Sequence, residues 1–148
     1  MLVKRIDLGS IPLGLYLTGE DIPKGSAVVL KSNKIYLPST KAEAGAVLGF
    51  ATLVIEDEAG GDIADHDVVK SGKPVVVYTL VRNNMWGTTR YVGTPVQGDS
   101  LAVAYAGADK GKLIKAGANA GVDDATPLFT AEKIGSAGSY ALMDVFVK

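Results

Sequence analysis

The residues best suited to chemistry lie in one acidic segment, residues 56–67, which also holds the single histidine of the chain. Asp62, Asp65 and Asp67 could supply oxygen ligands to Ca²⁺, and His66 could transfer a proton. The segment lacks the Asp-x-Asp-x-Asp-Gly pattern and the distal glutamate of a calcium-binding hand. A catalytic His66 would also need a nucleophile or carboxylate in reach, and the sequence does not place one. We interpret the segment as an exposed loop and expect no metal and no cofactor.

Other signatures of catalysis are missing from the chain. The sequence has no nucleophile elbow, no phosphate-binding loop ending in Lys-Ser/Thr, no zinc-ligand spacing and no dinucleotide fingerprint. The absence of cysteine excludes a thiol nucleophile, a disulfide and a cysteine metal site. We therefore expect no enzyme and assign no catalytic residue. A hydrolase that uses His66 is the alternative.

Composition favours a protein that packs against other proteins. The 148 residues carry 15 basic and 16 acidic side chains, so no basic stripe suited to nucleic acid is expected. Apolar residues make up 47% of the chain and glycine occurs 18 times, which indicates a surface of small, weakly polar side chains. An ordinary β domain with loops rich in Gly, Ala and Ser has the same composition.

No targeting or membrane segment is expected. Residues 1–7 lack the apolar stretch and small-residue cleavage site of a secretory signal. A membrane-spanning helix requires about eighteen consecutive apolar residues, and no apolar run in the sequence approaches that length. The sequence therefore predicts a soluble protein made in the cytoplasm.

Short apolar runs bounded by Gly, Pro, Asn, Asp or Ser predict an all-β fold with little helix. We expect one domain over residues 1–148, either a β-sandwich or a small β-barrel of the β-tulip type. Residues 27–37 predict a hairpin, because Ser32-Asn33 suits a tight turn. Residues 40–44 are the best candidate for a brief helix.

Two longer strands are predicted near the middle of the chain. Residues 46–56 are apolar for most of their length, and Gly49 within them indicates a bulge or a close backbone approach. Residues 74–82 form the strongest strand signal, with Pro74 at the first position, where a missing N–H is tolerated.

The order of these signals occurs twice. Residues 22–78 and again residues 96–147, both approximate bounds, contain four strand signals in the same order. These are a strand that follows a glycine, a short return strand, a third strand and a closing strand. We interpret the chain as two loosely similar β units, with an internal duplication as the explanation. A single β domain with regularly spaced turns is the alternative.

Two segments are candidates for contact with other proteins. Met85 and Trp86 lie in a polar segment, residues 82–90, which we interpret as a loop, and Tyr91 follows it. Large side chains presented from a loop often anchor protein contacts. The alternative is that Trp86 folds back onto the β core.

The second candidate is the amino-terminal segment. Leu2, Val3 and Ile6 alternate with charged residues there. This pattern suits an edge strand, or an arm that pairs with a neighbouring subunit by strand addition.

Most of the chain resembles a known family. The resemblance rests on the runs IPKGSAVV (22–29), AGAVLGFA (44–51), GDSLAV (98–103), GKL (111–113), ATPLF (125–129) and AGSY (137–140), followed by a terminal strand through residue 147. With these runs the chain resembles small bacteriophage capsid decoration proteins of the β-rich type, also called cement or head-stabilising proteins. Many such proteins carry one copy of the unit and are shorter, whereas this chain has two and a long connection at 79–95.

The resemblance implies a structural virion protein without catalysis or cofactor. Such a protein binds the outside of an assembled capsid, bridges neighbouring major capsid subunits and stabilises the shell, often as a homotrimer. It implies no contact with nucleic acid or membrane. Two alternatives stay open: another virion component, such as a head-fibre base or tail-associated β protein, and a carbohydrate- or ligand-binding β module that uses Trp86 and Tyr91.

Overall fold

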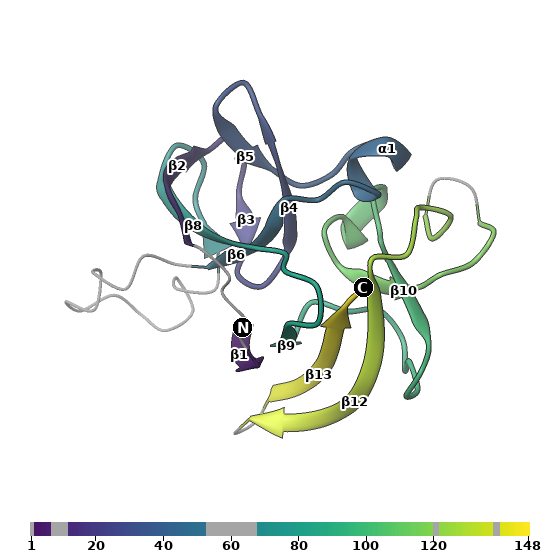
Figure 1. Cartoon of the computed structure of the whole chain (residues 1–148). Coiled ribbons are helices and arrows are strands. Elements are labelled where there is room, and N and C mark those ends of the chain that lie inside the picture. Colours follow the sequence, from purple (N-terminus) through teal and green to yellow (C-terminus); the bar gives the residue numbers. More distant parts are fainter. Residues whose placement is uncertain (1, 7–11, 53–67, 120–121, 138–139) are drawn as a thin grey trace.

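The computed structural model describes residues 2–6, 12–52, 68–119, 122–137 and 140–148. These residues form mainly β-strands, and the only helices among them are α1 (Lys41–Ala44) and a 3₁₀ turn, η3 (Gly107–Asp109) (Figure 1). The predicted all-β fold with little helix is confirmed. The acidic loop with Asp62, Asp65, His66 and Asp67 lies outside the described residues.

The first unit is a closed five-stranded barrel. Its strands follow one another around the barrel in the order β2 (Pro12–Thr18), β5 (Lys34–Tyr36), β4 (Ala27–Lys31), β6 (Gly49–Thr52) and β8 (Pro74–Thr79). A parallel pairing of β2 with β5 closes it. A two-stranded sheet, β3 (Ile22–Pro23) with β7 (Val68–Val69), adds to this unit. Its interior is aliphatic, with Val28, Ile35, Val75 and Val77 at 0% exposure.

Local sequence signals account for the turn, the helix and the strand start that were predicted here. Ser32 and Asn33 have φ values of 47° and 61°, so they form the left-handed turn that joins β4 to β5. Thr40 caps α1, because its side chain accepts the backbone N–H of Glu43. Pro74 is the first residue of β8, as predicted.

The second unit is a six-stranded sheet. Its strand order is β1 (Leu2–Ile6), β9 (Met85–Thr88), β13 (Tyr140–Val147), β12 (Phe129–Ala137), β10 (Ser100–Val103) and β11 (Leu113–Lys115). A parallel bridge between Tyr91, just beyond β9, and Leu113 in β11 brings the two ends of the β9-to-β11 series together. This bridge corresponds to the parallel pairing of β2 with β5 that closes the first barrel.

The two units have the same strand order. The order β5-β4-β6-β8-β2 in the first corresponds to β11-β10-β12-β13-β9 in the second, with the same parallel or antiparallel pairing at each step. Three backbone hydrogen bonds of the first unit have counterparts in the second. Gly25 N–H to Ala51 O (2.8 Å) corresponds to Gly98 N–H to Ala131 O (2.9 Å), and Leu80 N–H to Leu48 O (3.2 Å) corresponds to Lys148 N–H to Leu128 O (3.0 Å). Gly19 N–H to Ile35 O corresponds to Val92 N–H to Leu113 O, both at 2.9 Å. The likeness therefore includes β2 and β9, which precede the expected units at 22–78 and 96–147.

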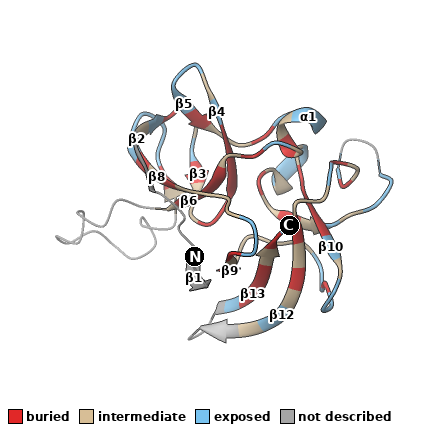
Figure 2. Ribbon diagram, viewed as in Figure 1, coloured by how far each residue is buried: buried red, intermediate tan, exposed pale blue. Residues whose placement is uncertain are grey.

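The units share a second hydrophobic core. Phe50 of the barrel packs against Trp86 and Phe129 of the second unit, with ring centroids 6.1 and 5.3 Å apart, and Tyr78 lies 5.3 Å from Trp86. Figure 2 shows the buried residues concentrated on strands such as β4, β9 and β13. The two units are thus packed as one body.

Gly49 has the close backbone approach that its position in the sequence predicts. A Cβ atom added at Gly49 would overlap the backbone carbonyl of Tyr78 on the adjacent strand β8. Because backbone cannot move aside as a side chain can, only glycine fits here.

We expect Gly49→Ala to lower the free energy of unfolding by about 1–3 kcal/mol through this overlap. Gly135→Ala is the matched control, because a Cβ added at Gly135 in β12 meets nothing within 4 Å. That variant should stay within about 0.5 kcal/mol of the parent chain. Urea unfolding followed by circular dichroism measures both, and equal effects would contradict the assignment.

Candidate functional site

The fold brings the two predicted contact segments together. Strands β1 and β9 pair antiparallel, with Leu2 opposite Thr88, Val3 opposite Gly87 and Ile6 opposite Met85. We call this strand pair the β1–β9 ribbon. It holds every interface candidate except Tyr91, although its two strands are far apart in the sequence. The amino-terminal segment, as β1, lies at one of the two edges of the six-stranded sheet.

The prediction of a loop at residues 82–90 is wrong for residues 85–88, because these form strand β9. Trp86 is 1% exposed and packs against Phe50 and Tyr78. It is a core residue and not an exposed anchor, in agreement with the alternative interpretation. The strand was missed because it has only four residues and its flanks, such as Asn83 at φ 66°, have turn composition.

Met85 and Tyr91 are half-buried. Met85 lies opposite Phe146 of β13, which in turn lies opposite Thr130 of β12, so these residues form a row across the sheet. Tyr91 packs against the shared core and bridges to Leu113. Of the two, Met85 belongs to the ribbon and Tyr91 to the seam where the second unit curls together.

Thr88 is a positioning residue that the sequence did not reveal. Its buried hydroxyl donates a hydrogen bond to the carbonyl oxygen of Gly25 (3.0 Å) and accepts one from the backbone N–H of Arg90 (3.0 Å). It therefore ties the end of β9 to the first unit. No local signal distinguishes this threonine from an ordinary turn residue.

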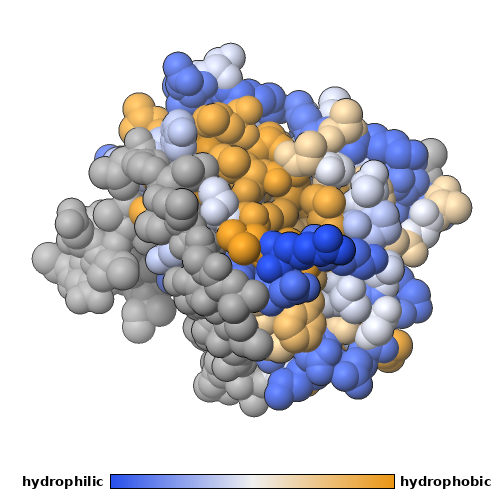
Figure 3. Space-filling model, in the orientation of Figure 1, coloured by the Kyte–Doolittle hydropathy of each residue, from blue (hydrophilic) through white to orange (hydrophobic). Residues whose placement is uncertain are grey.

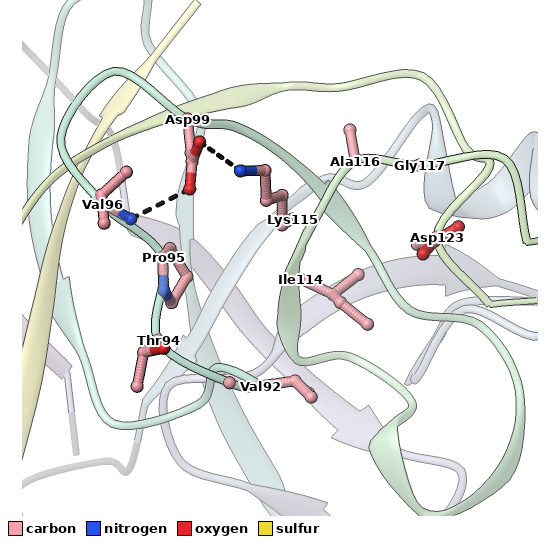
Figure 4. Close-up of a pocket in the computed structure, with 11 residues that line it drawn as sticks. Val92, Thr94, Pro95, Val96, Asp99, Ile114, Lys115, Ala116, Gly117 and Asp123 are labelled. Atoms are coloured by element: carbon pink, nitrogen blue, oxygen red, sulfur yellow. Dashed lines mark hydrogen bonds and ion pairs between the residues drawn. The ribbon is translucent and has the colours of Figure 1, made fainter.

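A hollow of about 500 Å³ in the second unit contains an ion pair (Figure 4). A carboxylate oxygen of Asp99 lies 2.8 Å from Lys115 Nζ, and the other accepts the backbone N–H of Val96 at 2.9 Å. Asp123, also at this hollow, accepts the backbone N–H and the side-chain amide of Asn119 at 2.7 and 2.6 Å. Both carboxylates are thus engaged in holding loops together.

The hydrogen bond from Lys115, and then that from Val96, lower the pKa of Asp99 below its ordinary value of 3.8. A carboxyl group with a lowered pKa stays ionised at neutral pH and is a poor proton donor. The arrangement around Asp99 therefore suits a structural tie better than acid–base chemistry.

Hydrophobic side chains gather over the first unit on the face that Figure 3 shows. A second hollow, of about 700 Å³, lies in this unit and is lined mainly by apolar residues, among them Val29, Leu30, Leu48 and Leu80. Leu30 is 40% exposed. Lys31 and Glu43 also line this hollow and form an ion pair at 3.0 Å. With these two charged groups paired to each other, the mainly apolar surface suits contact with another apolar surface.

Among the residues that the structure describes, His, Asp and Glu side chains form no group of three that could hold a metal ion. In the same ranges, no helix is both long and apolar enough to cross a membrane. Comparisons with known protein families, curated proteins and solved structures find no match for this chain.

The burial of Trp86 predicts a shielded fluorophore, because it is the single tryptophan. We expect blue-shifted emission that iodide quenches weakly in the folded chain. Trp86→Ala should lower the free energy of unfolding by about 3–5 kcal/mol, measured by circular dichroism in urea. Emission typical of a solvated indole, together with an unchanged stability in the variant, would contradict the core assignment.

The lowered pKa of Asp99 makes part of the stability dependent on pH. Its contribution is present above the unfolded-state pKa, near 3.8, and is lost as pH falls through the lower folded-state value. Asp99→Asn and Lys115→Met should therefore flatten the decline of the melting temperature below about pH 4. Variant curves that run parallel to that of the parent chain would show that this ion pair contributes nothing.

Proposed function

We propose that this chain is a structural virion protein that binds the outside of an assembled phage capsid. It stabilises the shell by bridging neighbouring major capsid subunits. The proposal is carried by one observation: the runs that resemble capsid decoration proteins, such as 22–29 and 98–103, correspond to strands and turns in both units of the β body. It acts without catalysis or a cofactor and makes no contact with nucleic acid or membrane.

Binding to the assembled state alone is sufficient for such a role. A ligand that binds one state stabilises that state by mass action, and many copies acting together multiply the effect. Charged residues make up only 21% of the chain, so a contact through small, weakly polar side chains removes few charges from water. The half-buried Met85 and Phe146 of the second unit and the apolar hollow at Leu30 supply contact surface.

The proposed assembly is a homo-oligomer, with a trimer favoured by the family resemblance. The chain is made in the host cytoplasm and is then located on the capsid exterior. A head-fibre base or tail-associated β protein would share these properties and differ only in its partner.

A ligand-binding β module is the second candidate, favoured by the hollow of about 500 Å³ at Asp99. Trp86 is buried and therefore offers no exposed ring on which a carbohydrate could stack. In the hollow, Asp99 and Asp123 are already hydrogen-bonded within the chain, so their carboxylates have less hydrogen-bonding capacity left for a ligand. The capsid role is therefore placed first.

Light scattering and co-sedimentation test the proposed function. We expect a stable trimer that pellets with expanded empty shells of the phage that encodes it. The trimer should not pellet with unexpanded shells. Met85→Glu should weaken co-sedimentation by about tenfold or more if the ribbon contributes to the contact. Ile134→Glu is the control, because Ile134 is 41% exposed and lies on another strand, β12.

Three outcomes would change the proposal. A monomer that pellets with neither kind of shell would overturn it and move the ligand-binding module to first place. Binding to tails or fibres in place of shells would transfer the role to another virion component. Equal losses in both variants would remove Met85 from the contact surface.

A further inference from the structure

We propose that the edge of β9 that β1 covers is a strand-accepting site, which also receives β1 of a second copy of this chain. Copies would then be joined by exchange of residues 2–6. The inference concerns contacts between copies and is independent of shell binding. It starts from the comparison of β9 with β2, its counterpart in the first unit.

The first unit shows that a barrel of this kind is complete without a strand like β1. Strand β2 pairs with β8 along one side, and on its other side only Leu17 and Thr18 pair, with β5. Among the described residues, no strand pairs with the preceding part of that side. The corresponding side of β9 is covered by β1. Strand β1 is thus an addition to the second unit and not one of its barrel strands.

The two edges differ in a way that explains why only one is covered. Strand β2 begins at Pro12, and its pairing with β8 shifts register between Leu13 and Tyr16. A proline and a bulge both discourage strand addition at an edge. Strand β9 contains no proline and pairs with β13 without a register shift. Its pairing with β1 shifts register once, between Lys4 and Ile6, and the extra residue lies on β1 and not on β9. The edge of β9 is therefore suited to receive a strand.

Chain connectivity makes β1 exchangeable. In the sequence β1 is followed by residues 7–11 and then by β2 of the first unit, yet it pairs with β9 of the second unit. In the described part of the chain its only strand partner is β9. Main-chain pairing is the same whichever copy supplies the strand, so an identical strand from a neighbour fits the same register. In a closed ring of copies every β9 edge remains paired.

Cysteine pairing tests the exchange in the full-length chain, which has no cysteine of its own. Ile6 and Met85 are register partners in the ribbon. Directly opposite residues of an antiparallel pair have Cβ atoms about 4.5–5.5 Å apart, close to the spacing that a disulfide needs. A chain with Ile6→Cys and a chain with Met85→Cys are mixed, unfolded, refolded together and oxidised. Any disulfide between positions 6 and 85 then joins two chains, and mass spectrometry of the linked peptides identifies it.

We expect this linkage to exceed by about tenfold that of a control mixture of Ile6→Cys with Lys133→Cys, because Lys133 is exposed and does not face β1. The double variant Ile6→Cys/Met85→Cys should then give covalent oligomers. If the double variant closes only within one chain, and the mixed single variants link no more than the control, the proposal is overturned.

A second variant gives an independent result. Val3→Pro places a proline opposite Gly87, where it removes a donor from β1. We expect light scattering to show loss of the oligomer while the shielded fluorescence of Trp86 reports an intact second unit. An oligomer that persists would contradict strand exchange. A monomeric variant that still pellets with shells would separate the two proposals, leaving shell binding in place.

Discussion

The packing of Phe50 into the second unit is the contact on which the arrangement depends. Phe50 belongs to the wall of the first barrel, yet its ring lies against Trp86 and Phe129 of the second unit. Small β units bury a limited fraction of their apolar surface, so a shared core adds stability that neither unit reaches alone. The same contact fixes Trp86, and through it strand β9. The position of the β1–β9 ribbon is thus a consequence of how the units meet.

Polar contacts then set the orientation of the units. The backbone N–H of Ala27 donates to the carbonyl of Gly111 (2.9 Å), and the Thr88 hydroxyl donates to the carbonyl of Gly25 (3.0 Å). A Cβ added at Gly111 would lie 3.0 Å from the carbonyl oxygen of Ala27, so the two backbones approach closely. Hydrogen bonds are directional, whereas hydrophobic packing is not. The aromatic core therefore holds the units together, and these bonds select one orientation.

The sequence predicted the features that depend on neighbours in the chain. The turn at Ser32-Asn33, the cap at Thr40 and the strand start at Pro74 each have a local cause, and each is found. Gly49 could be predicted because an isolated glycine in a strand usually marks a close backbone approach.

Features that depend on distant partners were missed. Strand β9 is four residues long and exists because β1 and β13 pair with it. Trp86 was expected in a loop because its burial depends on Phe50 and Tyr78, which lie in the other unit. The ribbon joins two candidate segments that the sequence could suggest only separately. The shared strand order places β2 and β9 in equivalent positions, so their edges can be compared directly. Strand β2 carries Pro12 and a bulge, whereas β9 has neither and is paired with β1, whose own bulge lies between Lys4 and Ile6. Two units of the same design can therefore differ in function through one edge alone.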